Sequence, residues 1–227
     1  MKIKTNLKIT LITLSFVLTL FGCKKENTFS DYKYEDKPTV LTCEGVNSKL
    51  YQEALYSFED DILNFYKNTN PKRTLIQSYS QLMANSIYGR MKYEDVVSEH
   101  TLKIFEALKK EEGLWNANSV KSHLNYNSDI IKCILNNMKD ESLKTTFNAL
   151  VTTNSMSPKL FGVPLMSNYR TTLSNDKYLA TYVALDLFYA KLFDIDFSKV
   201  NLEKPEPLDF NVIPPKNKVE PNTPNNQ

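Results

Sequence analysis

The sequence predicts an all-α protein, an irregular bundle of about six or seven helices. Apolar residues between positions 39 and 200 recur at intervals of three and four rather than two, which is the spacing of one face of a helix. Five glycines against ten prolines also disfavour a glycine-rich β architecture. Since the sequence shows no internal repeat, we do not expect a solenoid of regular units.

The first three helices are predicted from apolar spacing and from residues that favour helix ends. One apolar face over 50–66 predicts the first helix. Asn70 is suited to the N-cap and Pro71 to the first helical position. We therefore expect the second helix to start there and to end before Gly89. A third helix is predicted over 93–113.

The remaining helices follow a polar loop around Trp115. The apolar spacing predicts helices over 127–138 and 143–151, and Pro164 is expected to open a short one. The last predicted helix covers 176–193. Its residues are apolar on nearly all sides, so we expect it at the centre of the bundle.

Asp186 is the first candidate site residue, because its position places it on the buried side of the helix over 176–193. A buried carboxylate must be paired, hydrogen-bonded or protonated, since burying it alone is costly. One interpretation is a ligand contact or a general acid with a raised pKa. The other is a structural pair with Arg170, Arg73 or Arg90, or a hydrogen bond from a tyrosine.

His100 is the second candidate, because it lies on the apolar face of the helix over 93–113. It is interpreted either as a core residue with its hydrogen bonds satisfied or as part of a ligand site. Val97 stands three residues before it, so no Glu-x-x-His pair exists, and neither His-Glu-x-x-His nor Cys-x-x-Cys occurs. Two histidines do not build a conventional zinc site without carboxylates. We therefore predict no metal and no cofactor.

The first helix carries an acidic run from Glu59 to Asp61, and it places Glu53, Asp60, Asp61 and Asn64 on the side away from Phe58 and Ile62. Paired carboxylates or a calcium site are conceivable there. The spacing instead predicts a solvated helix face.

The N-terminus has the pattern of an export signal. Residues 1–8 carry three lysines and no acid, and an apolar run over 9–21 ends in Leu20-Phe21-Gly22-Cys23. This run of about 13 residues is shorter than the ~20 that a membrane-spanning helix needs. The ending resembles the lipobox of bacterial lipoproteins.

The resemblance implies that the thiol of Cys23 carries a diacylglyceryl group, that the chain is cut before it, and that the new amino terminus is also acylated. Several fatty chains would anchor the protein firmly in a membrane. In lipoproteins of double-membraned bacteria an aspartate after the cysteine favours the inner membrane, so Lys24 implies the outer membrane. Periplasmic and surface-exposed faces both stay open.

The predicted organisation has four parts: a lipoprotein signal peptide over 1–22, a lipidated flexible tether over 23–38, a helical domain over 39–200 and a disordered Pro/Asn-rich tail over 201–227. Cleavage removes three of the 28 basic residues and none of the 26 acidic ones, so the formal charge falls from +2 to about −1. This balance disfavours a nucleic-acid partner.

Two cysteines remain once Cys23 carries lipid, in an oxidising compartment. A disulfide between Cys43 and Cys133 is one interpretation. The other is a free thiol at Cys133 that serves as a small core residue among isoleucines.

The sequence lacks a recognisable catalytic constellation. No Gly-x-Ser-x-Gly motif and no glycine-rich phosphate loop occurs. We therefore expect a non-enzymatic, outer-membrane-anchored lipoprotein whose partners are membrane lipid, through Cys23, and another envelope protein. The alternative is a small-ligand-binding or hydrolase-like domain with a site near Asp186 and His100.

Overall fold

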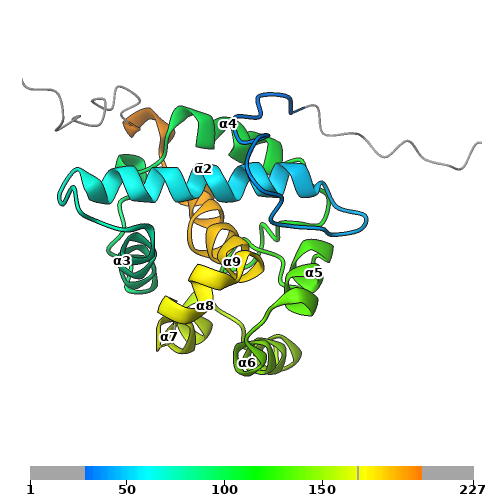
Figure 1. Ribbon diagram of the computed structural model, residues 1–227. Helices are drawn as coiled ribbons and strands as arrows, with labels where there is room; N and C mark the ends of the chain where they lie inside the picture. The colour runs from blue at the N-terminus through cyan, green and yellow to red at the C-terminus, as the bar shows by residue number, and fades with distance from the viewer. Residues whose placement is uncertain (1–28, 168, 201–227) are drawn as a thin grey trace, which may run out of the picture.

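The computed structural model describes residues 29–167 and 169–200, and this part of the chain is all-helical, as predicted (Figure 1). The predicted signal peptide, Cys23 and the tail over 201–227 lie outside these residues. The α-helices are α2 (Ser48–Lys67), α3 (Leu75–Ile87), α4 (Glu99–Leu108), α5 (Asp129–Asn137), α6 (Glu141–Thr152), α7 (Pro158–Ser167), α8 (Tyr169–Asn175) and α9 (Lys177–Leu187). The described residues also form three short 3-10 helices: η2 (Tyr93–Asp95) between α3 and α4, and η3 (Tyr189–Asp194) and η4 (Phe197–Lys199) after α9.

Helix α2 organises the bundle. It runs across the molecule with α4 on one side and α3 and α9 on the other, and it packs against all three (Figure 1). Phe58 and Ile62 of α2 have no exposed surface, and the Phe58 ring lies 5.2 Å from that of Phe188. Helices α6 and α7 lie at the far side of the molecule from α4 (Figure 1).

Helix α9 is as buried as its composition predicts, since every residue from Leu179 to Leu187 is buried. Its N-cap is Asp176, whose carboxylate accepts a hydrogen bond from the backbone N–H of Leu179 at 3.0 Å. The prediction of one continuous helix over 176–193 is wrong. Phe188 leaves the helical conformation, with φ −128° and ψ −70°, and the chain continues as η3.

Two other predicted helix starts are also wrong. Helix α3 begins four residues after Pro71, because Thr74 and Gln77 form a capping box in which each side chain bonds the other's backbone N–H. Pro164 lies inside α7, and Pro158 occupies the first position. A proline there needs no N–H partner.

The predicted tether over 23–38 is too long. Residues 29–38 are described, and they pack along α2. The cause is the Glu53 carboxylate, which accepts hydrogen bonds from the backbone N–H groups of Lys33 at 2.6 Å and Tyr34 at 3.1 Å. The Tyr34 hydroxyl also donates to Asp60 of α2 at 2.8 Å. The folded domain therefore begins by Phe29.

Candidate functional site

A row of polar side chains joins α2 to α4, and we call it the polar seam. Its three α2 members, Glu53, Ser57 and Asp61, recur every four residues and are at most 7% exposed. Each meets a residue at the start of α4. The seam consists of the pairs Glu53–His100, Ser57–Thr101 and Asp61–Ser98.

His100 is 5% exposed, and its Nε2 lies 2.7 Å from Oε1 of Glu53. Because a carboxylate only accepts, the Nε2–H donates this bond. On the other side of the ring, Nδ1 lies 3.6 Å from a carboxylate oxygen of Asp31. His100 is thus enclosed between α2 and the segment over 29–38, and its hydrogen bond joins α4 to α2.

The remaining two pairs complete the seam. The hydroxyl oxygens of Ser57 and Thr101 lie 2.6 Å apart. A carboxylate oxygen of Asp61 accepts from the backbone N–H of Ser98, the N-cap residue of α4, at 2.9 Å. These bonds fix where α4 starts against α2.

Another buried acid of α2 faces away from the seam. Glu59 is 6% exposed and accepts a hydrogen bond from the hydroxyl of Tyr79 at 3.0 Å. The ammonium of Lys177, the first residue of α9, pairs with the same carboxylate at 2.6 Å. Burial and this carboxylate raise the pKa of Tyr79 well above 10. Glu59 therefore joins α2, α3 and α9.

The prediction of a solvated face on α2 holds for Asp60 and Asn64, which are exposed, and is wrong for the other acids. Glu53, Glu59 and Asp61 are all buried, and only Asp60 of the acidic run is exposed. Helices on two sides of α2, together with the segment over 29–38, cover the surface that the spacing assigned to water.

Asp186 has no exposed surface and belongs to a separate cluster. One carboxylate oxygen accepts from the hydroxyls of Ser122 at 2.6 Å and Tyr126 at 3.0 Å, and the other accepts from Tyr182 at 2.7 Å. Burial raises the pKa of Asp186, while the three hydroxyl donors oppose this by stabilising the carboxylate. The cluster holds the loop before α5 against α9.

The arginines considered as partners of Asp186 bind elsewhere. Arg170 is exposed, and its Nε donates to the hydroxyl of the adjacent Tyr169 at 3.0 Å. The guanidinium groups of Arg73 and Arg90 each lie over a tyrosine ring. Asp186, His100 and Arg170 therefore do not share a polar site, and of the partners considered for Asp186 the structure has the tyrosines.

A disulfide joins Cys43, which precedes α2, to Cys133 of α5, with the two Cα atoms 5.9 Å apart. The sequence left open a disulfide or a free thiol at Cys133, and the structure has the disulfide. The hydroxyl of Tyr178 on α9 binds Thr42 beside it, at 3.2 Å from the backbone nitrogen.

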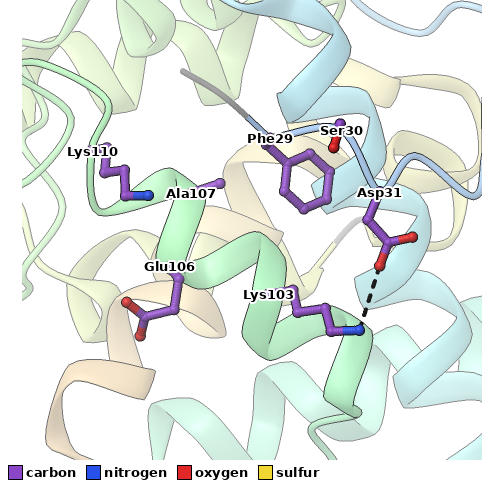
Figure 2. Close-up of a pocket in the computed structure, with 7 residues that line it drawn as sticks. All are labelled: Phe29, Ser30, Asp31, Lys103, Glu106, Ala107 and Lys110. Carbon is purple, nitrogen blue, oxygen red and sulfur yellow. Dashed lines mark ion pairs between the residues drawn. The ribbon is translucent and has the colours of Figure 1, made fainter. Parts of the chain in front are cut away.

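Three surface cavities can be described, and neither Asp186 nor His100 lines any of them. The first, of about 290 Å³, lies between α4 and the start of the described chain (Figure 2). The second, of about 380 Å³, lies between Gly45 and Asp129, and the third, of about 330 Å³, between Glu35 and Gln52. All three are open to solvent.

No group of three or more histidine, cysteine, aspartate or glutamate side chains among the described residues could hold a metal ion. Within the same residues, no helix combines the length and the apolar character needed to cross a membrane.

One apolar stretch of surface stands out on α7. Leu160 and Val163 lie one turn apart and are 54% and 53% exposed, with the half-buried Pro164 beside them. The opposite side of the helix, with Phe161 and Leu165, is fully buried. Helix α7 is therefore buried on one side, and on its open side these apolar side chains lie between the exposed Lys159 and Ser167. We call Leu160, Val163 and Pro164 the α7 stripe.

Comparison of the chain with protein-family models, curated proteins and solved structures gives no match. Its function must therefore be argued from its own residues.

Proposed function

We propose that the chain is a lipid-anchored module of the bacterial outer membrane that binds another envelope protein and carries out no chemistry. The anchor is the acylated Cys23, inferred from Leu20-Phe21-Gly22-Cys23. The partner-binding surface is the α7 stripe. Acylation would hold the domain at a membrane, where it meets other envelope proteins at high local concentration.

The observation that carries the binding role is the exposure of Leu160 and Val163 on a helix whose other side is already buried in the core. Adjoining exposed apolar side chains are a feature of protein-binding surfaces. The two polar residues that suggested a chemical site also favour a binding role. Asp186 and His100 are buried and form hydrogen bonds with other residues of the domain. A ligand site built on Asp186 and His100 would need both groups at one cavity, and neither lines any of the three described cavities.

The test is purification of the lipidated protein from its own membranes with and without the double substitution Leu160→Glu and Val163→Glu. The control is Val120→Glu, since Val120 is 100% exposed and lies in a loop outside α7. We expect a protein that co-purifies with the wild type and with the control, but not with the α7 variant. Co-purification with nothing, or equal recovery by all three, contradicts the proposal.

The anchor is tested separately by a variant that carries Cys23→Ser and, in place of residues 1–22, a signal peptide that is cleaved without lipidation. This variant is expected in the soluble fraction, while the wild-type protein stays with the membranes after washing in high salt. A wild-type protein that washes off contradicts the lipid anchor.

A further inference from the structure

The chain is fixed to the domain from Phe29 onward. The Phe29 ring is half-buried and packs edge-on against Tyr32, with ring centroids 4.9 Å apart. It also lies 6.3 Å from the ring of His100 on α4. The backbone of Lys33 is bound to Glu53 a few residues later. Any anchor before Phe29 therefore acts on the α4 side of the molecule.

Only residues 24–28 separate Phe29 from Cys23. A fully extended chain covers at most about 3.3–3.6 Å per residue, so these residues allow a separation of roughly 20 Å. That distance is about two helix diameters. The argument rests on the proposed acylation of Cys23. Given that anchor, the surface around Phe29 is held next to the bilayer.

This surface has a definite chemistry. Figure 2 shows Phe29 beside the cavity of about 290 Å³, with Asp31 on its own segment and Lys103, Glu106 and Lys110 along α4 and just after it. Two ammonium groups and two carboxylates thus line one depression. Asp31 and Lys103 are about half exposed and lie 3.6 Å apart.

Zwitterionic phospholipid headgroups present matching groups, a phosphate for lysine and an ammonium for a carboxylate. The two lysines and two acids of the depression cancel in charge, so a zwitterionic membrane surface neither attracts nor repels it strongly. A short link to the anchor supplies the missing affinity, because it raises the local concentration of the two surfaces to the millimolar range.

We infer that the α4 surface bearing Lys103, Glu106 and Lys110, together with Phe29 and Asp31, lies directly on the phospholipid bilayer that holds the acylated Cys23. Helix α7 lies on the opposite side of α2 from α4 (Figure 1). The anchored domain then presents the α7 stripe away from the membrane, where a partner can reach it.

The experiment measures how fast a water-soluble acylating reagent modifies individual lysines of the lipidated protein in vesicles of phosphatidylethanolamine and phosphatidylcholine. Mass spectrometry follows Lys103 and Lys110, with the exposed Lys159 of α7 as the internal control. The reference is the Cys23→Ser protein mixed with the same vesicles. We expect Lys103 and Lys110 to react several-fold more slowly in the lipidated protein and Lys159 to react at the same rate in both.

A second lipidated variant carries a flexible insertion of about twenty glycine and serine residues between Lys25 and Glu26, which lengthens the reach of the link. It is expected to float with the vesicles while Lys103 and Lys110 return to the rate of the Cys23→Ser protein. Protection that persists after the insertion overturns the short-link argument.

Flotation separates the two proposals. A wild-type protein that does not float with the vesicles refutes the lipid anchor. A wild-type protein that floats, but whose Lys103 and Lys110 react as fast as in the Cys23→Ser protein, leaves the anchor intact and overturns the inferred orientation.

Discussion

Two opposing effects act on the carboxyl group of Asp186. Burial disfavours its charged form, whereas the hydroxyls of Ser122, Tyr126 and Tyr182 favour it. Burial is the larger effect, so the pKa of Asp186 lies above its ordinary value of 3.8. The residue is therefore a structural acid whose proton is coupled to folding.

This coupling predicts a pH dependence with a definite sign. Because the folded state binds the Asp186 proton more tightly than the unfolded state, the stabilisation from this group is complete below the ordinary pKa of 3.8. It is lost as the pH rises through the higher pKa of the folded state. Asn at this position cannot titrate. The free energy of unfolding of the wild type, minus that of Asp186→Asn, should therefore decrease as the pH rises above about 4.

Urea unfolding of the two proteins between about pH 4 and pH 8 measures this difference. Asp129→Asn, at an exposed aspartate on α5, controls for the loss of one negative charge. A difference between the wild type and Asp186→Asn that stays constant or grows with pH contradicts the raised pKa.

Glu53 offers a second prediction at the level of a single residue. Its two oxygens accept from the backbone N–H groups of Lys33 and Tyr34 and from His100. In Glu53→Gln, one oxygen becomes an NH₂ donor, so at least one of these N–H groups faces another donor. An unsatisfied buried group costs about 1–3 kcal/mol, and we expect that loss in the free energy of unfolding.

The same substitution should also loosen the segment over 29–38, which limited trypsin digestion detects as faster cleavage after Lys33. Asp60→Asn is the matched control, since its amide oxygen can still accept from the Tyr34 hydroxyl. The control is expected to change stability by less than about 0.5 kcal/mol. Equal cleavage rates in Glu53→Gln and the wild type would show that Glu53 does not hold this segment.

At the scale of whole elements, α3 and α7 approach each other through a glycine. A Cβ built on Gly162 of α7 would lie 2.7 Å from Cγ1 of Ile87 on α3, and closer still to Cδ1. A methyl group fits there only if the Ile87 side chain moves, so Gly162 serves close packing rather than a turn.

Gly162→Ala should therefore destabilise the protein by about 1–3 kcal/mol, the cost of overpacking a core. Helix propensity alone would stabilise the alanine variant by up to about 1 kcal/mol, so the two effects differ in sign. Thermal unfolding of Gly162→Ala, Ile87→Ala and the double variant measures the coupling. We expect the double variant to lose less stability than the sum of the single losses. A stabilised Gly162→Ala would exclude the close contact.

The elements were largely predictable from the sequence because helical periodicity is local. Burial of Asp186 and His100 also follows from their positions on an apolar face. Helix ends were less predictable, because apolar spacing does not indicate them. Thr74 starts α3 through the hydrogen bonds of its capping box, and Phe188 ends α9 through its backbone angles.

The polar seam could not have been predicted from spacing alone. Glu53, Ser57 and Asp61 recur every four residues, and the same pattern describes a face open to water. What distinguishes the two cases is the partner, and the partners of these residues on α4 are 37 to 47 positions away in sequence. Apolar spacing does not indicate which of these distant residues come into contact.

At the scale of the whole molecule, one disulfide closes a long loop within the described chain. The disulfide between Cys43 and Cys133 spans 90 positions and encloses α2, α3, α4 and the first part of α5. The segment over 29–38 and the helices α6 to α9 lie outside this loop in sequence. The bridge thus ties the start of the domain to its middle, while α9 packs against both α2 and α5 without a covalent link.

The loop length predicts how much this bridge stabilises the whole molecule. In the chain-entropy model, closing a loop of 90 positions restricts the unfolded chain by about 4–5 kcal/mol, and measured values for native bridges are about 2–5 kcal/mol. In the Cys23→Ser protein, the double substitution Cys43→Ala and Cys133→Ala should lower the free energy of unfolding by about 2–5 kcal/mol. Urea unfolding of both proteins without reductant measures this difference. A reductant should destabilise the parent protein and leave the double-alanine variant unchanged. Thiol titration of the unfolded, unreduced parent should detect neither Cys43 nor Cys133, and reaction of both would refute the bridge.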